Sequence, residues 1–176
     1  ETKAVDTASI LGEHLELAPD VVEASGEVDR SATGYVSDDR HRELRDQLFA
    51  EPLVSAGGWE RGVDAQQRVV AALTLAVDEA RSGRTVAAIG HGGVGTMLLC
   101  HLLDVELAVE FDQPGQGHYW TWNGARGAIA HRWRPIDIVL ALEDPHDDDL
   151  VELVSAHLHL ASETSPTGHV HALDRE

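Results

Sequence analysis

Apolar residues recur at helical spacing from the first positions of the chain. Ala4, Ala8, Leu11 and Leu15 are three or four residues apart, which places them on one face of a helix. Gly12 indicates that this helix ends soon afterwards. The chain opens inside this pattern and not on a methionine, so we expect that residue 1 is not a natural start and that an upstream segment is missing.

The clearest helix is predicted over residues 63–81, with Gly83 just beyond it as a stop signal. A shorter helix is predicted over residues 38–49, because Pro52 prevents its continuation. Residues 25–36 are polar and predict a loop. The apolar positions of the long helix lie on one face: Val69, Val70, Leu73, Val77 and Ala80.

A short strand is predicted at residues 20–24, and a continuous apolar run predicts a strand buried on both faces at residues 84–89. A glycine-rich turn at residues 90–95 and an apolar helix through Leu103 follow the second run, and strand, turn and helix in this order form half of a βαβ unit. Aromatic and β-branched residues on both sides of Asn123-Gly124 then predict an antiparallel hairpin at a sheet edge. The pattern as a whole indicates an α/β fold.

The pattern changes after Pro135, where we place a domain boundary between residues 1–135 and 136–176. A strand is expected at residues 138–142 and a helix at 150–161. His157 and His159 are candidate metal ligands. Residues two apart on a helix point in different directions, however, so no metal is expected.

Charge and composition exclude several classes of function. The 176 residues carry 13 basic and 31 acidic side chains, a net charge of -18, which disfavours binding to nucleic acid or to an anionic membrane. No apolar run approaches the roughly 18 residues of a membrane span. Cys100 is the only cysteine and lies in an apolar stretch, so we expect a buried thiol and a cytoplasmic protein.

The glycine turn has the spacing of a dinucleotide-binding fingerprint, formed by Gly90, Gly92 and Gly95, with Glu110 as a candidate ribose-binding acid. A bulky His91 inside the turn and the aromatic hairpin after it weaken this interpretation. A tight turn with a purely structural role is the other alternative. An imidazole beside a helix N-terminus is better placed to bind an anion itself.

These features together resemble the histidine phosphatase (phosphoglycerate-mutase-like) superfamily over roughly residues 1–134. Its second catalytic histidine occupies a strand-His-Gly-Gly-helix turn similar to residues 86–95. Residues 3–8, Lys-Ala-Val-Asp-Thr-Ala, are similar to the family's Arg-Ala-x-Gln-Thr-Ala, and residues 27–30 fit the loop with its catalytic acid. Gly58-Trp59-Glu60 and Arg68-Val69 resemble its Gly-Glu-Ser and Arg-Val segments.

The resemblance implies a three-layer α/β/α sandwich without its first strand, and an enzyme that transfers phosphoryl groups from small phosphate esters through a phosphohistidine, without a cofactor. It makes His91 a donor to the phosphoryl oxygens and Glu27 the proton donor. It makes Lys3, Gly92 and Arg30 phosphate-binding residues. For Lys3 a solvated helix position is the alternative, and for Arg30 a surface ion pair.

Departures from the family pattern change these expectations. No Arg-His-Gly tripeptide, which supplies the family's nucleophile, occurs in the sequence, so this chain alone is expected to be inactive. Lys3 replaces a phosphate-binding arginine, and an ammonium group cannot make a bidentate guanidinium contact. A missing first strand would expose an internal sheet edge, which predicts dimerisation or aggregation.

Several alternatives stay open. A dinucleotide-binding module and a non-catalytic interaction domain are the other candidate functions. Residues 142–174 resemble the opening strand, helix and loop of a GNAT-type acetyltransferase, and the alternative there is a family-specific helix with a disordered tail. The substrate, and the choice between mutase and phosphatase, depend on loops such as residues 25–36 that a single sequence does not define.

Overall fold

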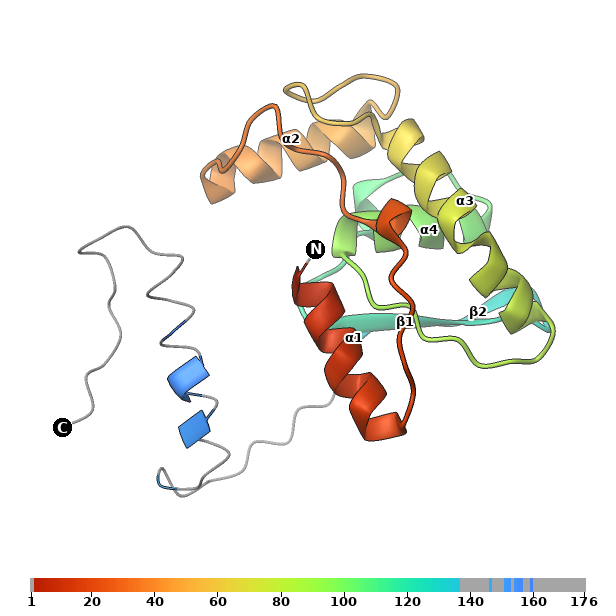
Figure 1. Cartoon of the computed structure of the whole chain (residues 1–176). Helices are drawn as coiled ribbons and strands as arrows, with labels where there is room; N and C mark the ends of the chain where they lie inside the picture. Colours follow the sequence, from red (N-terminus) through yellow and green to blue (C-terminus); the bar gives the residue numbers. More distant parts are fainter. Residues whose placement is uncertain (1, 137–145, 147–150, 153, 157–158, 160–176) are drawn as a thin grey trace. The chain divides into compact units, whose positions relative to one another are not determined.

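The computed structural model describes residues 2–136, 146, 151–152, 154–156 and 159. The chain divides into two compact units, Glu1–Ile136 and Asp137–Glu176, and all predicted site residues fall in the first (Figure 1). Of the helix expected at 150–161, the described residues between 151 and 159 are helical. The expected strand at 138–142 and most of the acetyltransferase-like segment lie outside the described residues. The domain boundary after residue 135 stays a prediction.

Four α-helices form within a few residues of their predicted bounds. Ser37 caps the second by accepting a hydrogen bond from the Arg40 backbone N–H at 3.4 Å, and Gly83, with φ +91°, follows the third. The first helix runs through Gly12 and is closed by Glu16 at φ 56°. None of the helices in the described residues is long and apolar enough to cross a membrane. Their bounds are α1 Thr2–Leu15, α2 Asp38–Ala50, α3 Gly62–Arg81 and α4 Gly92–Leu103.

The two strands predicted at residues 20–24 and 84–89 are not formed. Residues 17–22 are irregular and lead into a short 3-10 helix, η1 (Glu23–Ser25), and residues 84–90 are largely exposed without strand structure. Val86, expected in a core strand, is 38% exposed. A strand requires backbone hydrogen bonds to a neighbour, and no described segment supplies one here. Self-association through such an edge stays a prediction.

The hairpin is confirmed. Strands β1 (His118–Asn123) and β2 (Ala128–Pro135) pair antiparallel, with two register irregularities between Tyr119 and Trp122. The turn packs closely on the end of α3, since a Cβ on Gly124 would lie 2.5 Å from the Ala80 carbonyl oxygen. Helices and sheet together give the mixed α/β class that the sequence predicted.

Helix α4 is the centre of the core. Met97, Leu99 and Cys100 are fully buried, and Met97 and Cys100 share a hydrophobic cluster with apolar residues of α2 and α3. Burial raises the pKa of the Cys100 thiol, as expected for an inert structural cysteine. Thr96 is also buried, and its hydroxyl donates to the Gly92 carbonyl at 2.9 Å. This packing holds the N-terminus of α4 in a fixed place.

Candidate functional site

The N-terminus of α4 is the place where several predicted site residues meet. His91 is half-buried and immediately precedes the helix, and its carbonyl accepts a hydrogen bond from the Gly95 N–H at 2.9 Å. Gly92 and Gly93, which have no side chains, are the first two residues of the helix. The first N–H groups of a helix have no partner within it and carry partial positive charge, so they favour an anion.

The glycines let two polar side chains approach this helix end closely. A Cβ on Gly93 would lie 2.7 Å from Glu27 Oε1, and a Cβ on Gly92 would collide with the Gln113 side-chain amide. Glu27 Oε1 also accepts a hydrogen bond from the Val28 N–H at 2.9 Å. The predicted proton donor therefore lies beside the turn that carries His91, on a segment 65 positions earlier than Gly92.

Arg68, on α3, fixes the segment that carries Glu27. Its Nη1 donates to the carbonyls of Ala24 and Gly26 at 2.8 and 2.9 Å, and its Nη2 to the Glu27 carbonyl at 3.2 Å. The same guanidinium binds Glu60 in bidentate fashion, with distances of 2.9 and 2.7 Å. One side chain thus connects helix α3 to the backbone of the candidate acid and of the residues before it.

Glu60 binds both Arg68 and the backbone of Asp29. We call Arg68 and Glu60, with the backbone of residues 24–29 that they bind, the clamp. The hydrogen bonds from Arg68 lower the pKa of the Glu60 carboxyl, although burial acts against them. Its Oε2 accepts from the Asp29 N–H at 3.2 Å, while the Glu60 N–H donates to the Asp29 carbonyl at 2.9 Å. An ionised Glu60 therefore orients both Arg68 and the backbone of Asp29, two residues after Glu27.

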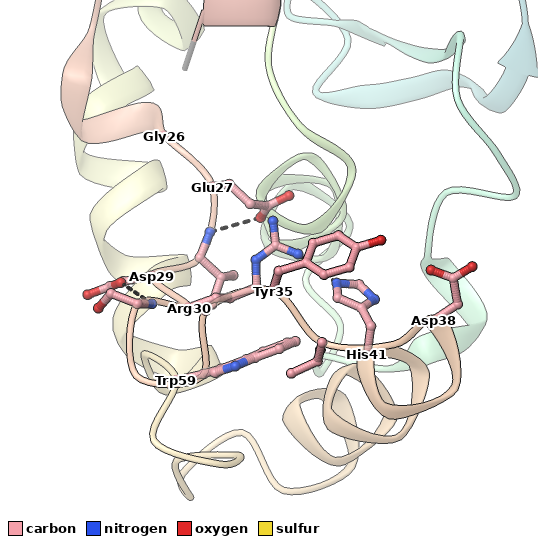
Figure 2. A pocket seen from close by; sticks show the side chains of 12 residues that line it. Gly26, Glu27, Asp29, Arg30, Tyr35, Asp38, His41 and Trp59 are labelled. Atoms are coloured by element: carbon pink, nitrogen blue, oxygen red, sulfur yellow. Dashed lines mark hydrogen bonds between the residues drawn. The ribbon is translucent and has the colours of Figure 1, made fainter. Parts of the chain in front are cut away.

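Arg30, His41 and Trp59 form a cluster beside Glu27 (Figure 2). Arg30 Nη1 lies 2.6 Å from His41 Nε2. A guanidinium only donates, so Nε2 is the acceptor and the neutral His41 ring carries its proton on Nδ1. The Trp59 indole, 3% exposed, supports both groups: its ring centroid is 5.7 Å from Arg30 Cζ and 5.4 Å from the His41 ring.

The surroundings keep His41 neutral. Burial lowers the pKa of the imidazole, and the positive charges of Arg30 and Arg45 lower it further. Glu27 and Asp38 act in the opposite direction but do not reverse the shift. The hydrogen bond from Arg30 requires this neutral form, because a protonated ring would present a donor to a donor.

Acidification is therefore expected to destabilise the protein through His41. The unfolded chain has a His41 pKa near the ordinary value of about 6.5 and the folded chain a lower one, so the unfolded state binds more protons as pH falls below that value. Stability contributed by neutral His41 is complete above it and lost toward the folded pKa. Urea unfolding at about pH 7.5 and 5.5 should show a smaller acid loss in His41→Gln, which keeps an acceptor near Nε2 but does not titrate. Equal losses would contradict this assignment.

Two adjoining hollows meet at this cluster. The smaller, about 340 Å³, is lined by Gly92, Gly93 and Glu27 among others. The larger, about 720 Å³, extends over the loop after Arg30. Both are lined by Glu27, Val28, Arg30, His41 and Trp59.

The predicted site residues are brought together only in part. Glu27, Arg30 and Gly92 line the smaller hollow. His91 is adjacent to Gly92 in sequence but lines neither hollow, and Lys3 lies exposed on α1. The alternative for Arg30, a surface ion pair, is not found among the described residues. The catalytic and phosphate-binding roles of all five residues stay predictions.

Three contributors were not assigned a role from the sequence. Glu60 and Arg68 belong to the segments that resemble the family. The sequence therefore marked these positions but did not show which groups they contact. Nothing in the sequence around His41 marks it, because it lies within a highly charged stretch of helix α2. In the described part of the chain, no group of three or more His, Cys, Asp or Glu side chains could hold a metal ion.

Comparison with known proteins identifies the family of the chain. Residues 2–121 match the family described as the histidine phosphatase superfamily (branch 1). The match covers more than half of the 176 residues, so the chain belongs to the histidine phosphatase superfamily, and its mixed α/β structure is consistent with that fold. No curated protein matches the chain significantly.

Proposed function

We propose that this chain is a phosphoryl-transfer domain that binds small phosphate esters at the N-terminus of α4. The observation that carries the proposal is the Glu27 carboxylate over Gly93, beside the turn that holds His91. Helix N–H groups and an imidazole donor there would bind the phosphoryl oxygens. Glu27, when protonated, would give its proton to the leaving oxygen as the phosphorus–oxygen bond breaks.

The nucleophile is the part that this sequence does not supply. The family's Arg-His-Gly tripeptide is absent from residues 1–176, so we propose that the chain by itself binds an ester without transferring its phosphoryl group. Hydrolase or mutase activity then belongs to a protein in which that tripeptide is present. The cytoplasmic location, and the exclusion of nucleic acid and membranes as partners, stay predictions from charge and composition.

Calorimetric titration with methylphosphonate, an unreactive phosphate analogue, tests the pocket. The wild-type chain should bind it, and His91→Ala should bind roughly ten- to a hundredfold more weakly, because a hydrogen bond to a charged group contributes about 1.5–3 kcal/mol. His101→Ala is the matched control, since His101 lies exposed on the same helix. Equal binding by wild type and His91→Ala would refute the assignment. An NADH titration would test the dinucleotide alternative in the same way.

A further inference from the structure

The side chain of Gln113 lies against the N-terminus of α4, in the smaller hollow. A Cβ on Gly92 would be 3.4 Å from both Cβ and Cδ of Gln113 and closer still to its Oε1. The carboxamide therefore rests directly on the first residue of the helix, and a side chain at position 92 would require it to move. Glu27 approaches the same helix end over Gly93.

Asp112 fixes the backbone of Gln113. Its Oδ1 accepts a hydrogen bond from the Gln113 N–H at 2.8 Å and lies 3.2 Å from the Thr96 hydroxyl of α4. Its Oδ2 lies 3.4 Å from Arg45 Nη1 of α2. Pro114 follows in the sequence and disfavours a helical backbone at Gln113. The carboxamide thus extends from a backbone that is held against two helices.

The carboxamide itself has no hydrogen-bond partner among the described residues, although Gln113 is half-buried. It offers two N–H donors and an accepting oxygen. The carboxylates of Glu27 and Asp112, in the same hollow, both accept hydrogen bonds from the protein. Gln113 therefore presents polar atoms to whatever occupies the hollow.

The charge of a phosphoryl group determines which end of the carboxamide it would contact. Its oxygens are negative and accept hydrogen bonds, so they attract the amide N–H groups and repel Oε1. Rotation about the last side-chain bond of Gln113 exchanges Oε1 and Nε2 without moving the rest of the residue. A donor is also needed here, because Lys3, the cation expected from α1, is exposed and lines neither hollow.

We propose that Gln113 is a substrate-binding residue, whose amide N–H group donates a hydrogen bond to an oxygen of the phosphoryl group bound at α4. The backbone contacts of Asp112 hold this donor beside Gly92 before the ligand arrives, which lowers the entropy lost on binding. The inference rests on the proposed function, because it requires the phosphoryl group at this helix end.

Calorimetric titration of the full chain with methylphosphonate tests this role in two variants. Gln113→Met keeps the length of the side chain and removes the donor, so it should bind roughly ten- to a hundredfold more weakly than the wild type. Gln113→Glu keeps the shape but places a carboxylate against the anion, so it should bind more weakly still. The stability of Gln113→Met in urea should equal that of the wild type, since the described residues give the carboxamide no partner to lose.

Gln67→Glu is the matched control for the added charge, because Gln67 is exposed on α3, and it should bind methylphosphonate like the wild type. Equal losses in Gln67→Glu and Gln113→Glu would overturn the proposal. Tighter binding by Gln113→Met would also overturn it, since the carboxamide would then only cover the helix end. Binding that depends on His91 but not on Gln113 refutes this inference alone. A wild type that binds no methylphosphonate, or equal binding by His91→Ala, refutes the proposed function itself.

Discussion

Replacing Arg68 with methionine is expected to lower the free energy of unfolding by about 2–3 kcal/mol, because hydrogen bonds to charged groups are lost and their partners left unsatisfied. The substitution removes every donor that Arg68 provides to Glu60 and to the carbonyls of Ala24, Gly26 and Glu27. The segment that carries Glu27 should then exchange its amide hydrogens faster. Urea unfolding and hydrogen exchange measure the two effects.

Arg61→Met is the control for this prediction. Arg61 immediately precedes α3 and pairs with the carboxylate of Asp64, in the first turn of the helix. This pair is exposed and local in sequence, so its loss should change the free energy of unfolding little. Arg68→Lys should recover only part of the loss, since an ammonium cannot bind Glu60 in bidentate fashion. Equal stability of Arg68→Met and Arg61→Met would show that the clamp does not hold the segment.

Replacing Trp59 with alanine should have the largest effect on stability, about 3–5 kcal/mol, because it removes a large buried ring and leaves a cavity. The side chain is 3% exposed and belongs to the main core. It also supports Arg30 and His41, so the variant should lose the fixed arrangement of these two side chains even under conditions where it remains folded.

Trp59→Phe separates packing from hydrogen bonding. It keeps an aromatic ring but removes the bond from Nε1 to Thr33 Oγ1, 2.8 Å long, which should cost about 1 kcal/mol. Urea unfolding followed by circular dichroism suits the comparison, because three other tryptophans contribute to fluorescence. A similar stability of the alanine and phenylalanine variants would contradict the core role of the ring.

The helices and the hairpin could be predicted because their signals are local. The apolar face of α3 repeats every three or four residues, and Gly83 marks its end through a backbone conformation that glycine adopts easily. Asn123-Gly124 likewise separates two runs of aromatic residues. Such patterns depend on neighbours in the chain and hardly on tertiary contacts.

Whether residues 84–89 form a strand could not be predicted from local patterns in the same way. An apolar run shows that a segment is suited to a buried strand, but a strand also needs a neighbour, and the run does not identify one. Val86 is partly exposed for this reason. The prediction of a buried strand over residues 84–89 was therefore wrong.

The residues of the candidate site were likewise predicted only where the sequence carried a signal for them. Glu27, Arg30 and Gly92 were proposed together from family resemblance, and the structure places all three around one hollow. His41 had no signal, because its role depends on a neutral ring between Arg30 and Trp59 that only the folded chain creates. The clamp by Arg68 was equally invisible, since it joins residues more than 40 positions apart.

That separation also has a consequence for the order of folding. Contacts between α3 and the segment before Glu27 close a loop of 42 to 44 residues, and the chain must lose the corresponding entropy before the contacts can compensate for it. We therefore expect this part of the molecule to be completed late, after α3 and α4 have packed. A peptide of residues 20–36 alone would contain Glu27 and Arg30 but not the geometry that makes them a site.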